Sequence, residues 1–346
     1  MARRPLVLLA SLALVAVAAT PVVAKNPNAV NAYRVTVLQS DATDANLVNG
    51  WGIVSGPATP WWVSNNETDT STLYNAAGVK QALTVAVDGG PTGVVFNGAA
   101  AFPVTAGGSN FARFIFATIS GTVQAWTGGL TASVVRATAA DDGSYTGLAI
   151  GMVGTAPYLY AADFANGRVD VYDGAFALQT WAGAFTDPAL PAGYAPFGIQ
   201  ELGGSVYVAY ALRGADGDEV AGAGLGIVSR FGTDGSFQGR VATGGALDAP
   251  WGLAIAPASW GRLAGQLLVG NFGDGRINTF RPTASGWEPT GHLKTANHQP
   301  LVIDGLWGIS FGKGAIAANG PTSTLFFAAG PEDETEGQFG TITAVP

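Results

Sequence analysis

The sequence predicts an all-β fold, a six-bladed β-propeller with four strands in each blade. A short motif occurs six times, in which Gly follows a mostly aromatic residue and precedes an aliphatic one. Successive copies are 41 to 56 residues apart, and a period of about 40–50 residues built of short strands is typical of propellers. The motif glycines are Gly52, Gly93, Gly147, Gly198, Gly252 and Gly308.

Short strands follow each motif glycine. In the fifth copy, residues 251–256, 266–271 and 276–281 are runs of apolar and β-branched residues, and the third copy repeats this pattern over 146–172. Such runs, bounded by Gly, Asn, Asp and Pro, predict strands. We expect each motif glycine to lie at the start of an innermost strand, because a side chain there would crowd the neighbouring backbone.

The last unit predicts how the ring closes. The first five units each have a fourth strand, which we expect at 179–185 in the third unit. The sixth unit has only three strands, the last of them 340–345, while the strand-like segment 33–38 near the N-terminus has no unit of its own. Placing this segment in the sixth blade as its fourth strand removes the open sheet edge.

The chain divides into a signal peptide, residues 1–24, and a single propeller domain, residues 25–346. Arg3 and Arg4 form a positive segment, an apolar stretch follows, and Val22-Val23-Ala24 matches a small-residue cleavage site. We therefore expect a secreted or periplasmic protein with no membrane span after cleavage, and the Gly- and Ala-rich usage suggests a bacterial source.

Composition restricts the chemistry and the partners. There is no Cys, so disulfides and thiolate catalysis are excluded. Cleavage after residue 24 takes the formal charge from −8 to about −10. This acidity argues against nucleic acid as a partner, because nucleic-acid binding depends on Lys and Arg at phosphates.

Four segments resemble an uncharacterised family of secreted bacterial propeller proteins with NHL-like repeats. They are Pro250–Ala254, Leu268–Asn278, Asp304–Gly308 and Thr341–Pro346. The resemblance extends over nearly the whole mature chain. It implies a six-bladed propeller and export, but no established reaction, so no catalytic residue is carried over and the catalytic residues are unknown.

Polar residues follow several of the second strands, where we expect one mouth of the central channel. They include Asn65, Glu67, Asp163 and Asn271. Oxygen ligands from several blades could hold Ca²⁺, as in gluconolactonase-like propellers, in which a central cation polarises a carbonyl. The alternative is structural, because Asp and Asn after a strand often hydrogen-bond the backbone of their own turn.

Two acidic insertions interrupt the repeat between second and third strands. Residues 213–224 carry Asp218 and Glu219, and residues 330–337 carry Asp333 and Glu334. Insertions at the mouth of a scaffold often carry binding residues. We expect both at the same mouth, either as ligand or cation sites or as solvated acidic loops.

These observations favour a protein that binds an unknown small molecule, glycan or protein partner at the mouth of its channel. The first alternative is a Ca²⁺-dependent lactone or ester hydrolase, and the second is a structural envelope or matrix protein. Standard catalytic motifs are missing, and the two histidines, His292 and His298, lie in a late polar stretch. Whether the protein is an enzyme is left open by the sequence.

Overall fold

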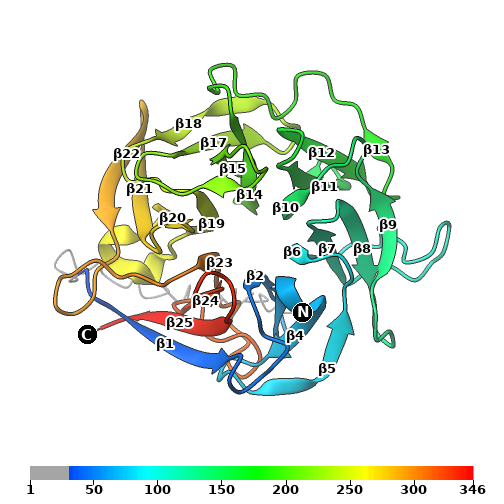
Figure 1. Ribbon diagram of the computed structural model, residues 1–346, viewed down its shortest axis with the longest axis horizontal. Coiled ribbons are helices and arrows are strands. Elements are labelled where there is room, and N and C mark those ends of the chain that lie inside the picture. Colours follow the sequence, from blue (N-terminus) through cyan, green and yellow to red (C-terminus); the bar gives the residue numbers. More distant parts are fainter. Residues whose placement is uncertain (1–30, 346) are drawn as a thin grey trace, which may run out of the picture.

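The computed structural model describes residues 31–345, and the predicted signal peptide lies outside this range. Six antiparallel sheets are arranged around a central axis, each with the strand that contains the motif glycine innermost (Figure 1). The all-β fold class and the six four-stranded blades predicted from the repeat are confirmed.

The blades follow one another along the chain. The first three contain β2 (Gly50–Val54), β3 (Trp61–Asn65), β4 (Thr70–Tyr74) and β5 (Lys80–Ala86); β6 (Pro91–Phe96), β7 (Phe114–Thr118), β8 (Thr122–Trp126) and β9 (Val134–Thr138); and β10 (Tyr145–Val153), β11 (Ala156–Asp163), β12 (Arg168–Asp173) and β13 (Leu178–Gln179). The next two contain β14 (Tyr194–Leu202), β15 (Ser205–Arg213), β17 (Gly226–Gly232) and β18 (Phe237–Thr243); and β19 (Pro250–Ile255), β20 (Leu267–Asn271), β21 (Ile277–Thr283) and β22 (Gly286–His292).

The sixth blade joins the two ends of the propeller. It contains β23 (Leu306–Phe311), β24 (Leu325–Ala329), β25 (Gln338–Ala344) and, outermost, β1 (Tyr33–Ser40). β1 runs antiparallel to β25, with Tyr33 opposite Ala344 and Val37 opposite Gly340. The predicted closure by an N-terminal strand is confirmed, and Figure 1 shows the blue and red strands side by side.

The motif glycines form a closed ring of close backbone contacts. A Cβ on Gly52 would lie 2.4 Å from the carbonyl oxygen of Thr92 in the next blade, and a Cβ on Gly252 would lie 2.5 Å from that of Trp307. The last blade returns to the first, because a Cβ on Gly308 would lie 2.6 Å from the carbonyl oxygen of Trp51. Glycine is needed because the innermost strands approach more closely than any side chain allows.

Two short strands and two 3₁₀ segments depart from the expected pattern. The fourth strand of blade three was expected at 179–185, but β13 has two residues and the chain then turns, with Phe185 at a φ of +52°. Blade four gains β16 (Glu219–Val220), which pairs with the end of β15. The 3₁₀ segments are η1 (Asn66–Thr68) and η2 (Ala258–Leu263).

Apolar side chains from facing blades form the core. One large cluster joins blades five and six, with Leu268, Ile277, Leu306 and Phe327 all fully buried. Packing between sheets therefore holds a chain that has no disulfides. Within residues 31–345, no helix has both the length and the apolar character that a bilayer crossing requires.

Candidate functional site

Aromatic side chains close the central channel at the end where the innermost strands begin. Trp51 and Trp307 stack with their ring centroids 3.6 Å apart, and Phe272 also stacks on Trp307, at 4.1 Å. The indole N–H of Trp251 donates to the carbonyl oxygen of Thr146 at 2.9 Å, so this side chain links blade five to blade three across the axis. The motif that builds the ring therefore also supplies most of its plug.

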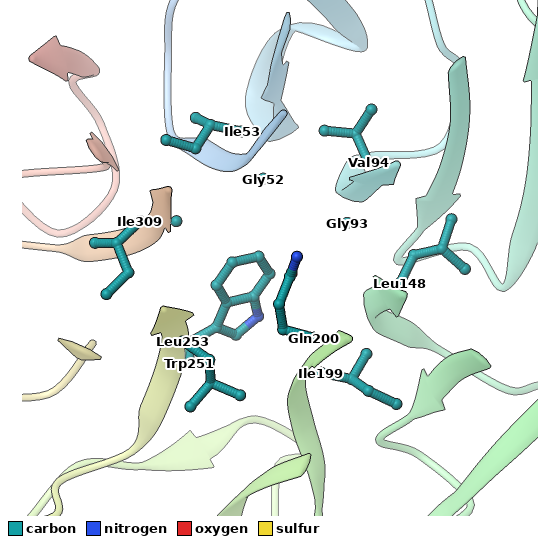
Figure 2. A pocket seen from close by; sticks show the side chains of 11 residues that line it. Gly52, Ile53, Gly93, Val94, Leu148, Ile199, Gln200, Trp251, Leu253 and Ile309 are labelled. Carbon is teal, nitrogen blue, oxygen red and sulfur yellow. The ribbon is translucent and has the colours of Figure 1, made fainter. Parts of the chain in front are cut away.

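Beyond this plug, little space remains on the axis. The cavity there has a volume of about 20 Å³. Figure 2 shows Trp251 and Gln200 pointing toward its centre, with aliphatic residues such as Ile53 and Ile309 around them. Because one water needs roughly 10–15 Å³, the channel has room for about one water and is not a passage for a ligand.

On the outer side of the plug, the mouth widens into a pocket of about 450 Å³. Trp51, Phe164 and Phe272 form its aromatic floor and belong to the cluster that plugs the channel. Cavities of roughly 300–1,000 Å³ accommodate small organic molecules. We call this cavity the mouth pocket, and the four carboxylates that line it are Asp218, Glu219, Asp333 and Glu334.

The insertion of blade four is held in place by backbone pairing. In β16, Glu219 lies opposite Arg213 at the end of β15. The Arg213 guanidinium donates to the carbonyl oxygens of Phe164, at 3.2 Å, and of Ala165, which ties the insertion to blade three. The segment expected to be a loop is thus partly strand, and this pairing fixes the backbone that carries Asp218 and Glu219.

The insertion of blade six has an unusual backbone. Glu332, Asp333 and Glu334 have φ values of +53°, +51° and +66°, in the left-handed region. This conformation costs a residue with a side chain roughly 1–2 kcal/mol. The backbone N–H of Glu332 donates to a carboxylate oxygen of Asp304 at 3.1 Å, and the Thr335 hydroxyl donates to the carbonyl oxygen of Glu332 at 2.6 Å. Strain of this kind concentrates at functional sites.

The two glutamates of the mouth pocket are half-buried and repel each other electrostatically. Burial raises the pKa of Glu219 from 4.5 to about 7, and the nearby carboxylates of Glu334 and Asp218 add to the rise. Burial also raises the pKa of Glu334, with further contributions from Glu67, Asp218 and Asp333, against the opposing effect of the Asn49 side chain. Bringing negative charges together in a concave site disfavours their ionised forms.

Two hydrogen-bond donors of the pocket lining have no partner among the described residues. The indole N–H of Trp51 is buried and unpaired, whereas those of Trp251 and Trp307 are both bonded. The side-chain amide nitrogen of Asn66 is also buried without a partner. A buried donor without an acceptor costs about 1–3 kcal/mol, so both positions favour a ligand that supplies acceptors.

Three of the sequence-predicted candidates lie beside the mouth pocket, each directly before a residue that lines it, but they do not line it themselves. Asn65, Asp163 and Asn271 have no exposed surface and do not contact the mouth pocket. Their side chains bond within their own blades: the Asn65 amide donates to the Thr72 hydroxyl at 3.0 Å, and Asp163 accepts from the backbone N–H of Ser144 at 3.1 Å. Their side chains therefore stabilise turns, which is the structural alternative to a ligand site.

Glu67 lies beside the mouth pocket but does not line it. It is exposed in η1, next to the lining residue Asn66, and its charge acts on Glu334. Asp218, Glu219, Asp333 and Glu334 all line the mouth pocket. Within residues 31–345, however, no three His, Asp or Glu side chains are spaced to hold a metal ion.

A larger cavity, of about 710 Å³, lies at the other end of the innermost strands. Its lining includes Phe96, Met152, Pro157 and a single carboxylate, Glu201. One oxygen of that carboxylate accepts the backbone N–H of Gly204 at 2.6 Å, within its own turn. No unpaired buried donor or acceptor belongs to the lining given for this cavity, so we consider the mouth pocket the stronger candidate.

The aromatic floor was not predicted from the sequence, although a signal for it exists. Phe164 follows Asp163 and Phe272 follows Asn271 in the equivalent turns of blades three and five. The polar residue of each pair is the more conspicuous candidate because its side chain carries an oxygen that can coordinate a metal ion. In the structure that residue is buried, and the phenylalanine after it lines the pocket.

Comparisons with solved structures show the fold alone. The soluble aldose sugar dehydrogenase of Escherichia coli is 12% identical, with 90% of this chain and 100% of that chain covered and a TM-score of 0.53. Virginiamycin B lyase from Staphylococcus aureus is 13% identical, with coverage of 90% and 100% and a TM-score of 0.51.

Sequence comparison finds relatives in a virus. No family model matches the chain. An uncharacterised protein of Acanthamoeba polyphaga mimivirus is 30% identical over 322 residues, which cover 88% of this chain and 77% of the viral protein. A second uncharacterised mimivirus protein is 31% identical over 317 residues, covering 86% and 81%. The chain, a six-bladed β-propeller, belongs to the family of these mimivirus proteins.

Proposed function

We propose that the protein is an exported binding protein that holds a small organic ligand in the mouth pocket. The observation that carries this proposal is a pocket of about 450 Å³ above a plugged channel. The plug makes the pocket a dead end with an aromatic floor, which suits retention of a ligand rather than its passage.

Export, a bacterial source and NHL-like repeats belong to the same proposal. Export is supported by Arg3 and Arg4, the apolar stretch after them and the small-residue site before Lys25. The absence of Cys removes any dependence on the redox state of the compartment. A secreted or periplasmic location follows from these features. The NHL-like character rests on the repeated motifs quoted above.

The arrangement of residues supports binding over hydrolysis. A Ca²⁺-dependent hydrolase gathers about six oxygens around its ion, whereas the described carboxylates are not spaced to hold a metal. A histidine-to-alanine variant of the staphylococcal lyase is catalytically inactive. In this chain His292 ends β22 and lines a separate cavity, and His298 lies in a turn, so neither lines the mouth pocket.

Filling the mouth pocket tests the proposal. Ala165 lines the pocket, so Ala165→Trp should occupy its space, and Ala175→Trp, in an exposed turn of the same blade, is the matched control. Thermal shifts would be measured with four probe groups of similar size: aromatic amines, aromatic alcohols, aromatic carboxylates and disaccharides. We expect at least one group to raise the Tm of the wild type and of Ala175→Trp, but not of Ala165→Trp.

Two results would contradict the proposal. The first is no shift with any group, and the second is a shift that survives in Ala165→Trp. A further arm adds millimolar Ca²⁺ and then EDTA. A rise in Tm with Ca²⁺ that EDTA reverses, and that is lost in Asp218→Ala with Asp333→Ala, would replace the binding proposal with the hydrolase alternative.

A further inference from the structure

We infer that the ligand of the mouth pocket is a small organic cation: an ammonium group on an apolar body that also carries a hydrogen-bond acceptor. This inference rests on the proposed function and names its ligand class. Three features of the pocket lead to it: uncompensated negative charge, an aromatic floor and unpaired buried donors.

The charge of the pocket is one-sided. Four carboxylates line it, and no Lys, Arg or His does. None of the four takes part in an ion pair within residues 31–345. Arg213 contacts the lining, and its guanidinium is bonded to the carbonyl oxygens of Phe164 and Ala165. A concave surface with unpaired charge of one sign concentrates ligands of the other sign.

The size and spacing of the pocket favour an organic cation over a metal ion. A metal ion needs several oxygens at about 2.3–2.6 Å, but the described acids do not form such a group. The carboxylates are instead spread around a pocket of about 450 Å³, on insertions from two different blades. A molecule of organic size can contact both insertions at once, and it need not lose its whole hydration shell.

The floor of the pocket suits the apolar part of such a molecule. Trp51, Phe164 and Phe272 offer aromatic surface next to the acids. An ammonium group near an aromatic face gains about 0.5–2 kcal/mol from the ring quadrupole, and a hydrocarbon body gains from burial. Anions gain from neither the carboxylates nor the ring faces, so the pocket discriminates by charge.

The unpaired donors indicate a second polar group on the ligand. Trp51 is only 5% exposed and its N–H has no partner, although the equivalent Trp251 and Trp307 are both bonded. Asn66, which also lines the pocket, has a buried side-chain amide nitrogen that likewise has no hydrogen-bond partner. An oxygen on the ligand would satisfy a donor that the protein leaves unpaired.

A matched series of probes tests the inference. Phenylalaninol carries an ammonium group, an aromatic ring and a hydroxyl. N-acetylphenylalaninol lacks the charge, N-acetylphenylalanine reverses it, and phenethylamine lacks the hydroxyl. Calorimetry near pH 8 should show phenylalaninol binding at least about tenfold more tightly than the two acetylated probes, and a few-fold more tightly than phenethylamine.

Variants assign the contacts. Glu219→Gln and Glu334→Gln should each weaken phenylalaninol binding roughly tenfold, whereas Glu288→Gln, an exposed acid of an outer strand, should leave it unchanged. Trp51→Phe keeps an aromatic floor but removes the donor. It should reduce the preference for phenylalaninol over phenethylamine. The Tm of each variant verifies that it folds. Each Gln substitution removes repulsion between carboxylates rather than a stabilising contact.

The outcomes separate the inference from the proposed function. If neutral or anionic probes bind as tightly as phenylalaninol, and Ala165→Trp abolishes their binding, the cation inference is wrong while the binding function stands. If phenylalaninol binds but Glu219→Gln and Glu334→Gln leave its affinity unchanged, the carboxylates do not select the ligand and the inference is also wrong. If no probe of any charge binds the wild type, both fail.

Discussion

Replacement of Glu219 by Gln should stabilise the protein at alkaline pH and have much less effect near pH 5. Burial and neighbouring carboxylates raise the pKa of Glu219 from 4.5 to about 7. The folded-state pKa therefore exceeds the unfolded-state pKa, and between the two values the folded protein binds more protons than the unfolded chain. By linkage, the wild type loses stability as the pH rises through this window. The Gln side chain of the variant carries no charge, so the variant escapes the loss.

The size of the effect follows from the shift. Each pKa unit corresponds to 1.36 kcal/mol, so a rise from 4.5 to about 7 amounts to roughly 3 kcal/mol. The pocket is open to solvent, which screens the charge, and we expect an advantage of about 1–2 kcal/mol near pH 8. Near pH 5 Glu219 is protonated in most folded wild-type molecules, and the stability advantage of the variant should fall below about 1 kcal/mol.

Chemical denaturation at the two pH values measures this difference. Free energies of unfolding would be compared for the wild type, Glu219→Gln and the control Glu288→Gln, an exposed residue in an ion pair with Arg281 at 3.0 Å. An equal gain at both pH values, or a loss of stability near pH 8, would refute the view that Glu219 is ionised at a cost in the folded protein.

Four further predictions follow from contacts described above or from the same charges. Glu334→Gln should lower the pKa of Glu219, because it removes a like charge, and NMR titration of the Glu219 carboxyl measures it; an unchanged titration would mean that the two acids are not coupled. Gly252→Ala places a Cβ 2.5 Å from the Trp307 carbonyl oxygen and should cost at least about 3 kcal/mol in a urea melt, against less than about 0.5 kcal/mol for Gly128→Ala, which meets no neighbour. Arg240→Ala leaves the buried Asp187 without its partner at 2.6 Å and should cost about 3 kcal/mol, whereas Arg281→Ala should cost under about 0.5 kcal/mol; equal losses would argue against a special role for burial. Deleting residues 31–40 removes β1 and should lower the Tm more than any single substitution named here, because β25 loses its outer partner.

The architecture was predictable because its signal is repeated. A single Gly-centred motif is weak evidence, but six copies at regular spacing require the same local contact six times. The last unit is one strand short, and one strand near Tyr33 belongs to no unit. In the structure this strand, β1, pairs with β25 and completes the last blade. The fourth strand predicted for blade three, at 179–185, lies further along the chain than the observed β13. Its expected residues turn inward instead, with Trp181 packed on Tyr158 at 4.9 Å and Phe185 on Tyr160 at 5.1 Å.

The site was predictable only where the repeat is broken. Asp218 and Asp333 stand out because their loops have no counterpart in other blades, and both line the mouth pocket. Asn65, Asp163 and Asn271 share a repeated position at the end of a second strand, which indicates a turn common to their three blades. The sequence could not show whether a given side chain is buried. A side chain at a strand end can point between blades or into the mouth, and only the packing decides which.

The pairing of β1 with β25 has a consequence for how the chain must fold. The two strands are separated by about 310 residues, so closing that loop costs roughly 5 kcal/mol of chain entropy. Synthesis at 5–20 residues per second leaves β1 without its partner for about 15–60 s. For this time it is an unpaired edge that could associate with other chains. Arg34, exposed on β1, places one charge on this edge, and a charge on an edge strand disfavours pairing with other chains.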